Sequence, residues 1–307
     1  MVRFKTSTDN VFSPKLLRHL REKLIEFILL IAACSSVATT FGILYILVSE
    51  SIYFFSEVSL LRFITDKEWT PLFLEKNYGI INLLSGTLVT SAVALFVAIP
   101  LGTIIAIYLS EFANSKLREI VKPILELLTA IPTVVYGYLA LLVLTPFLQQ
   151  FLPNLPTFNM LSAGLVMGLM IIPMISSISE DAMAAVPLSL KEGSYSMGAT
   201  RLQTAIKVVF PSAISGISAA YILGASRAIG ETMIVAVAAG LQPNLTWNPL
   251  SQGATITAYI VQVSLGDLPH GTVEYQTIFA AGLTLVLMTL VLNIIGYFLS
   301  RRFREIY

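Results

Sequence analysis

The chain has 307 residues, of which 56% are hydrophobic and only 12% are charged. A soluble domain is typically about 45–50% apolar and about 25% charged, so this composition indicates an integral membrane protein. The single cysteine, Cys34, excludes an intrachain disulfide, and two histidines are too few for a histidine metal cluster. The formal net charge is only +1, yet the positive charges are distributed very unevenly along the chain.

Six stretches are long and apolar enough to cross a bilayer, since a span needs about 20 residues. We therefore predict an all-α integral membrane protein with six transmembrane helices. Proline occurs inside three of these stretches, at Pro100, Pro132 and Pro173, where it predicts kinks or irregular backbone. The predicted spans are Leu24–Val48, Gly79–Leu109, Val121–Leu148, Met160–Ile178, Ser212–Gly240 and Thr277–Leu299.

Lysine and arginine predict the orientation, because cytoplasmic segments of membrane proteins carry an excess of both. Of the 19 basic residues, 15 fall in the N-terminal segment, the second and fourth loops and the C-terminal tail. Three fall in the first loop, and Arg227 lies within the fifth span. Both termini are therefore predicted to be cytoplasmic. We divide the chain into residues 1–78, with the first span and first external loop, and a five-helix core of residues 79–307.

Two opposite charges, Arg227 and Glu231, stand four residues apart in the middle of the predicted fifth span. A charge at the bilayer centre costs about 2.5–3.5 kcal/mol even on lenient scales, so such a residue needs a reason to be there. On one continuous helix the two side chains would share a face. They could form an ion pair that fixes helix packing, although Arg before Glu is the less favourable order. Arg227 could instead pair with a partner subunit, or the two residues could face a solute pathway.

The chemistry of this pair favours a pathway for a protonated oxyanion. Arginine offers a planar fork of donors that matches tetrahedral oxyanions. A carboxylate accepts a hydrogen bond from a phosphate that still carries a proton, whereas it repels a fully ionised anion such as sulfate. Arg227 and Glu231 are therefore the candidate substrate-binding residues.

The predicted third span holds weaker candidates. Thr133, Tyr136 and Tyr138 could line a polar path, although tyrosine also belongs to interfacial belts. Glu126 lies near the cytoplasmic end of this span, with Lys122 four residues before it. We interpret these two as an interfacial ion pair.

The loop before the fifth span carries signals for two short helices. Ser189 and Glu192 form an S-x-x-E capping box, which predicts a helix start, and Gly198 suits the end of that helix. Thr200 and Gln203 form a second such box. A short helix here would lie across the membrane surface, where a cytoplasmic partner could push on it.

The same loop contains Glu192-Gly193-Ser194, followed by Gly198 and later by Pro211. This order resembles the EAA loop of the permease subunits of binding-protein-dependent ABC importers, although Gly193 and Ser194 replace two alanines. The resemblance implies a type I importer (MetI-like) permease core, with a coupling helix at about residues 188–199 that docks on an ATPase subunit. The residues that it assigns to ATPase coupling are Ser189, Glu192, Gly193, Gly198 and Arg201.

Three further segments narrow the resemblance: residues 66–80 in the first loop, 131–137 in the third span and 227–233 in the fifth. They resemble segments of the phosphate permease subunits of the PstC family, and the similarity runs from about Leu24 to Arg302. It implies that Arg227 and Glu231 serve phosphate passage. The alternatives are a permease for molybdate or sulfate, the sister subunit PstA, or a proton-coupled transporter.

No G-x-x-x-x-G-K-[ST] sequence occurs, so the chain has no P-loop, and we expect it to be no enzyme and to hold no cofactor or metal. The resemblance implies that ATP and Mg²⁺ are bound by a partner ATPase dimer of the PstB type. It also implies a second permease subunit of the PstA type, an external phosphate-binding protein of the PstS type, and inorganic phosphate as substrate. The expected place is the lipid bilayer of the bacterial inner membrane, with no nucleic-acid partner.

Overall fold

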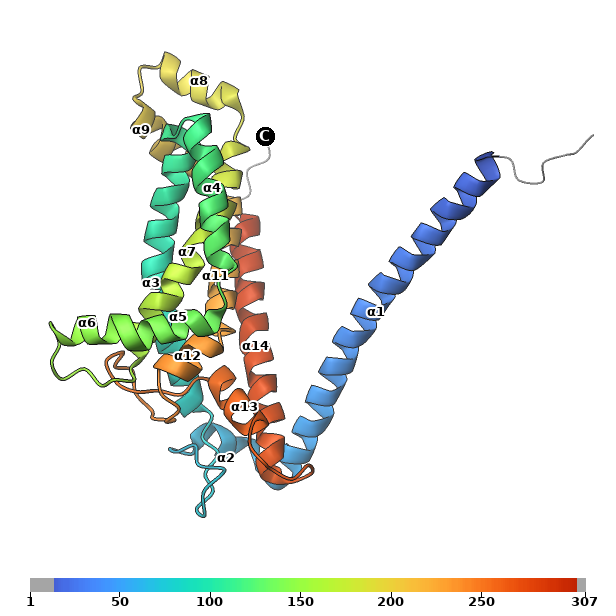
Figure 1. Cartoon of the computed structure of the whole chain (residues 1–307), viewed down its shortest axis with the longest axis vertical. Helices are drawn as coiled ribbons and strands as arrows, with labels where there is room; N and C mark the ends of the chain where they lie inside the picture. The colour runs from blue at the N-terminus through green and yellow to red at the C-terminus, as the bar shows by residue number, and fades with distance from the viewer. Residues whose placement is uncertain (1–13, 303–307) are drawn as a thin grey trace, which may run out of the picture. The chain divides into compact units, whose positions relative to one another are not determined.

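The computed structural model describes residues 14–302, which are almost entirely helical (Figure 1). In that range the only β-structure is an isolated bridge between Trp69 and Tyr78. The helices are α1 (Pro14–Glu57), α2 (Leu60–Thr65), α3 (Ile81–Ile107), α4 (Ser115–Thr129), α5 (Thr133–Leu139), α6 (Thr145–Gln149), α7 (Met160–Ala184), α8 (Leu188–Ser196), α9 (Arg201–Thr204), α10 (Phe210–Ser212), α11 (Ile214–Ile229), α12 (Met233–Ala238), α13 (Ile256–Ser264) and α14 (Val273–Arg302). Three π-helical turns are η1 (Tyr108–Phe112), η2 (Ala140–Leu144) and η3 (Ala205–Val209).

The chain separates into two compact units, which meet between Glu50 and Ser51 within α1. The described part of the first unit is a single helix. Arg21–Glu57 of α1 is long and apolar enough to cross a membrane, which confirms the first predicted span. All other helices belong to the second unit, which contains every candidate functional residue.

Four helices of the described chain can each cross a membrane alone: Arg21–Glu57, Ile81–Phe112, Met160–Ala184 and Val273–Phe298. The predicted third and fifth spans are instead helix pairs bent by 87° and 73°. Six spans result if each bent pair counts as one. The structure therefore agrees with the predicted membrane class but breaks two of the predicted helices.

The bend in the third span follows from a proline. α4 ends at Thr129 and α5 begins after Pro132, which lacks an amide donor and disfavours helical backbone at the residue before it. Figure 1 shows α4 running along the bundle, whereas α5 and α6 run across it. Of the three prolines predicted to disturb a span, Pro100 and Pro173 lie inside the continuous helices α3 and α7, and Pro132 alone marks a break.

The core of the second unit forms where α3, α7 and α11 pack together. Glycine permits the close approach of α3 and α7. A Cβ added at Gly164 would lie 2.7 Å from Cβ of Val93, and one at Gly168 would lie 2.8 Å from the carbonyl oxygen of Ala94. Small residues allow membrane helices this contact. Fully buried core residues of α7 include Met167, Ile171 and Ile175.

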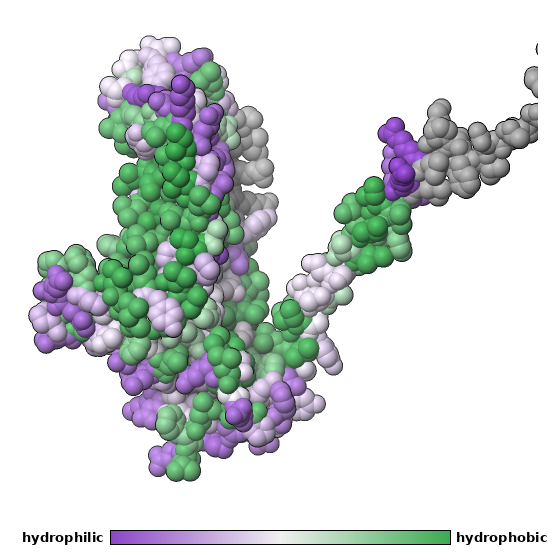
Figure 2. Space-filling model, viewed as in Figure 1, coloured by the Kyte–Doolittle hydropathy of each residue, from purple (hydrophilic) through white to green (hydrophobic). Residues whose placement is uncertain are grey.

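The two ends of the second unit are distinct. Figure 1 shows α8, α9 and the C-terminal end of α14 at one end, and α2 and α13 at the other. This agrees with the prediction that the fourth loop and the basic end of the last span lie on one side, whereas residues 303–307 of the tail lie outside the described residues. On the visible face of this unit, apolar side chains cover the middle and hydrophilic ones gather toward both ends (Figure 2). That distribution fits a bilayer around the middle.

The first loop packs tightly at the α13 end. Trp69 is 1% exposed, and its ring centroid lies 5.1 Å from that of Tyr259 in α13. Lys76 forms an ion pair with Glu274 at the start of α14. The hydrogen bond and charge of Glu274 raise the pKa of Lys76 above its usual range. α13 lies in the segment between α12 and α14, which follows the predicted fifth span.

Candidate functional site

The predicted fifth span is broken beside its two charged residues, Arg227 and Glu231. α11 ends at Ile229, α12 begins at Met233, and Glu231 lies in the break between them. Arg227 occupies the last turn of α11. The prediction that Arg227 and Glu231 share one helix face is therefore wrong, and they form no ion pair in the described chain.

Glu231 stabilises the break between α11 and α12 through hydrogen bonds of its side chain and its backbone. Its Oε1 accepts backbone hydrogen bonds from Met233 at 3.1 Å and from Ile234 at 3.3 Å, which satisfies amides at the start of α12. Its backbone carbonyl accepts the hydroxyl of Thr257 in α13 at 2.7 Å. The residue is only 8% exposed. An acidic side chain just before a short apolar helix is a capping signal that sequence analysis could have used.

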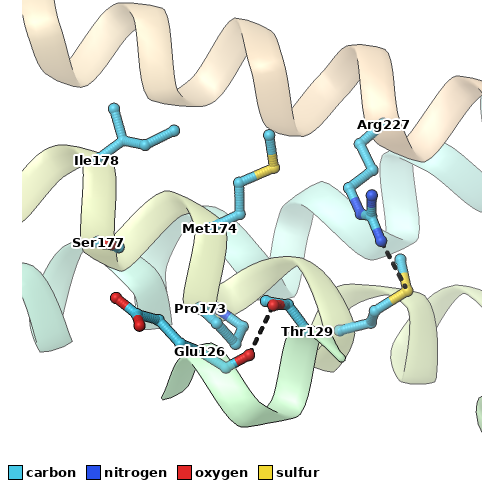
Figure 3. Close-up of a pocket in the computed structure, with 8 residues that line it drawn as sticks. Glu126, Thr129, Pro173, Met174, Ser177, Ile178 and Arg227 are labelled. Carbon is cyan, nitrogen blue, oxygen red and sulfur yellow. Dashed lines mark hydrogen bonds between the residues drawn. The ribbon is translucent and has the colours of Figure 1, made fainter. Parts of the chain in front are cut away.

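Arg227 lies instead on the wall of a cavity of about 390 Å³ between α4, α7 and α11 (Figure 3). Its Nη2 lies 3.8 Å from Sδ of Met170. In residues 14–302 its guanidinium forms no ion pair. The cavity is lined by Glu126, Thr129, Met170, Pro173, Met174, Ser177, Ile178 and Arg227.

Glu126 lies on the cavity wall and not in the interfacial ion pair that was predicted from the sequence. It projects from α4 into the cavity from the wall opposite Arg227 (Figure 3). The predicted ion pair with Lys122 is wrong, because the Lys122 ammonium binds α7 instead. Its Nζ lies 2.7 Å from Oε2 of Glu180 and 2.6 Å from Oδ1 of Asp181. These acceptors lie almost 60 positions along the chain, so no local pattern could reveal them.

The weaker candidates of the third span do not line this cavity. Tyr136 is buried, and its hydroxyl donates to the carbonyl of Leu128 at 2.7 Å, so it supports the turn between α4 and α5. Tyr138 is 54% exposed, and Thr133 begins α5. The polar side chains that line the cavity are therefore the charged Arg227 and Glu126 and the hydroxyl-bearing Thr129 and Ser177.

The proposed coupling helix exists as α8, but it starts differently from the prediction. Pro187 occupies the N-cap position, and no side chain caps the helix, so the Ser189–Glu192 capping box is wrong. Ser189 lies one residue inside the helix, because α8 already begins at Leu188. Gly198 has φ of 81° directly after the helix, as expected at a helix end.

The second predicted capping box is confirmed. The Thr200 hydroxyl accepts from the Gln203 amide at 3.3 Å, and the Gln203 side chain accepts from the Thr200 amide at 2.9 Å. Arg201 follows as the first residue of α9, with its guanidinium carbon 5.5 Å from the Phe112 ring centroid. This contact connects α9 to η1.

α8 has one face tied to the membrane core and one open face. On the tied face, Lys191 Nζ donates to Oε1 of Glu111 in η1 at 2.7 Å, and Glu111 is 5% exposed. Ser194 and Thr204 exchange a hydroxyl hydrogen bond of 2.9 Å. The open face includes Ser189, Glu192 and Gly193, all exposed. A Cβ added at Gly193 would meet nothing within 4 Å.

Comparison with known sequences identifies the class. Residues 98–305 match the family described as binding-protein-dependent transport system inner membrane component. The chain is 38% identical over 246 residues to the probable ABC transporter permease protein YqgH of Bacillus subtilis, covering 80% of this chain and 79% of that protein. It is 34% identical over 254 residues to the phosphate transport system permease protein PstC of Xylella fastidiosa, covering 76% of each.

Solved structures show the same fold. A bacterial ABC transporter that imports alginate matches with a TM-score of 0.63 at 17% identity, covering 94% of this chain and all of the other. The MetNI methionine ABC transporter, in an inward-facing conformation, matches with a TM-score of 0.55 at 19% identity, covering 74% and 95%. The chain therefore belongs to the binding-protein-dependent inner-membrane permease family of ABC importers. It is a membrane transport subunit rather than an enzyme.

Proposed function

We propose that this chain is a permease subunit of an ATP-driven phosphate importer, and that phosphate passes through the cavity beside Arg227. One observation carries the proposal: an arginine without an ion-pair partner in the described chain lines a cavity between membrane helices. A charge in that environment is costly unless something compensates it. The 34% identity to a protein named as the phosphate permease PstC supports phosphate as that compensating ligand.

The polar groups of the cavity suit weak binding of an anion that passes through, rather than high-affinity binding. A guanidinium can donate to two oxygens of a tetrahedral oxyanion through its planar fork. The rest of the wall offers the Ser177 hydroxyl, one carboxylate and mainly apolar or thioether groups, while the Thr129 hydroxyl already donates to the Glu126 backbone carbonyl at 2.7 Å. A pathway must release what it admits, so a single arginine beside a carboxylate binds more weakly than a dedicated receptor would. High-affinity capture then belongs to an external phosphate-binding protein of the PstS type.

The coupling helix supplies the energy input in this proposal. The open face of α8 docks on an ATPase dimer of the PstB type, which binds ATP and Mg²⁺. The tied face transmits the movement through Lys191 to Glu111 in η1, and through Ser194 to Thr204 in α9. A second permease subunit of the PstA type completes the pathway on the side of the cavity that this chain leaves open.

The second candidate is a permease for another oxyanion. The relative with 38% identity is named only as a probable ABC transporter permease, without a substrate. Arginine recognises molybdate and sulfate by the same geometry as phosphate. The two functions differ in which anion the intact complex accumulates.

The test is uptake by the complete transporter in proteoliposomes with ATP inside. Arg227→Gln is expected to reduce phosphate uptake by about 100-fold or more, because the fork and charge are lost at the same time. Arg18→Gln, which changes an exposed arginine of α1, is the matched control and should transport normally. Unchanged uptake with Arg227→Gln contradicts the pathway role. Accumulation of molybdate or sulfate in place of phosphate by the unmodified complex supports the second candidate.

A further inference from the structure

Two glutamates compete for the role of selecting the anion, and the structure separates them. We infer that Glu126 of α4 is the carboxylate that faces the transported anion and discriminates by protonation, whereas Glu231 is a structural cap. This inference rests on the proposed function, because it names the specificity residue of the same cavity. It changes the assignment that the sequence suggested for Glu231.

Glu231 is already committed to the backbone. Its Oε1 accepts the amides of Met233 and Ile234, and the residue is only 8% exposed. It does not line the cavity that contains Arg227. A carboxylate held by two amides of a helix start orders the chain, and reorienting it toward a ligand would leave those amides unsatisfied.

Glu126 has the opposite properties. It is exposed in the chain, lines the cavity with Arg227, and forms no ion pair in residues 14–302. Its nearest cation in sequence, Lys122, is bound by Glu180 and Asp181. The carboxylate is therefore available to a ligand.

The arrangement of the cavity favours an anion that carries a proton. Its two opposite walls present one guanidinium and one carboxylate, with the hydroxyls of Thr129 and Ser177 also on its lining (Figure 3). As it passes through the cavity, monohydrogen phosphate can accept hydrogen bonds at Arg227 and can donate its own O–H at Glu126. A fully ionised oxyanion has no proton to donate, so it meets only repulsion at Glu126.

The test measures the electrostatic effect of Glu126 inside the cavity through the reactivity of a thiol, which does not require transport. The chain has one native cysteine, so Cys34→Ser with Ser177→Cys places a single thiol on the cavity wall. In the assembled transporter, that thiol is reacted with a methanethiosulfonate that carries a sulfonate group, and separately with a neutral methyl reagent. The sulfonate is a permanently ionised oxyanion. The readout is the ratio of its rate constant to that of the neutral reagent.

Removing the carboxylate charge with Glu126→Gln should raise this ratio about threefold to tenfold, since a like charge is lost at short range. Glu126→Asp keeps the charge and should keep the ratio. Two controls should stay within about twofold, because both are carboxylates outside the cavity. They are Glu231→Gln and Glu119→Gln, the latter an exposed residue two turns earlier on α4.

Each outcome decides a different claim. An unchanged ratio with Glu126→Gln, or an equal rise with Glu231→Gln, overturns the inference. Failure of Glu126→Gln to assemble, when Glu126→Asp assembles, also overturns it by showing a structural role. Protection of the thiol from the neutral reagent by millimolar phosphate, lost with Arg227→Gln, tests the proposed function separately. Absent protection together with a raised ratio rejects phosphate as the ligand but keeps Glu126 as the charge filter.

Discussion

Charged side chains are arranged differently in two regions of this permease. Near α8, buried carboxylates are ion-paired: Glu180 with Arg118 and Lys122, and Glu111 with Lys191. In the cavity between α4, α7 and α11, Arg227 and Glu126 have no ion-pair partner in the described chain. Pairing makes a charge a fixed connection between helices, whereas an unpaired charge keeps its interaction for a ligand or another subunit.

The difference also separates mechanical from chemical roles. The paired charges connect η1 to α8 and α4 to the end of α7 that leads into α8. They therefore lie along the route by which movement of a docked ATPase would enter the membrane core. The unpaired charges lie beyond that route, on the wall of the cavity. Variants that disturb each class should fail in measurably different ways.

The largest effect is expected from breaking the fully buried pair. Glu180 is 0% exposed, and Arg118→Leu with Lys122→Met would leave its charge uncompensated between α4 and α7. Loss of both partners should cost about 3–5 kcal/mol of unfolding free energy, measured by denaturant titration in mixed micelles. Lys116→Met, an exposed lysine on the same helix, is the matched control and should change stability by less than about 0.5 kcal/mol. A double variant as stable as the control would show that the pair does not hold the helices.

A smaller loss is expected at the coupling helix. Lys191→Met leaves Glu111 without its cation and should cost about 1–3 kcal/mol. Because this pair transmits movement in the proposed mechanism, the phosphate carried per ATP hydrolysed should also fall. Gly193→Trp probes the open face of α8 instead, since a Cβ there would meet no other described part of the chain within 4 Å.

The comparison of these two variants tests the division between the faces of α8. Gly193→Trp should leave the stability of this chain nearly unchanged yet prevent co-purification of the ATPase, while Gly193→Ala should preserve both. Destabilisation by Gly193→Trp equal to that of Lys191→Met would contradict an open docking face.

Sequence patterns predicted the elements whose causes are local. Apolar length predicted the spans, Pro132 predicted irregular backbone, and Thr200 with Gln203 predicted a helix start. The Ser189 box failed because Pro187 already occupied the N-cap position. The end of α11 was missed because its apolar character continues through Gly230, and one glycine seldom ends a helix without further help.

The candidate site was harder to predict than the fold. Arg227 was predicted as a candidate because a charged residue within an apolar stretch can be recognised from the sequence alone. Glu126 was assigned to a neighbour four residues away, although that lysine binds acceptors on α7. Which carboxylate faces a cavity depends on the packing of three helices, and no spacing along one helix contains that information.

The smallest expected effects distinguish the two glutamates that sequence analysis could not. Glu231→Ala removes the carboxylate that accepts the Met233 and Ile234 amides before α12 and should cost about 0.5–2 kcal/mol of unfolding free energy. Glu126→Ala removes a side chain without an ion pair in the described chain, so its cost should stay within about 0.5 kcal/mol. Both variants are measured by the same denaturant titration, so that their losses of unfolding free energy can be compared directly. If Glu126→Ala were the more damaging change, its carboxylate would be structural, and the cavity would lose the charge that we assign to anion selection.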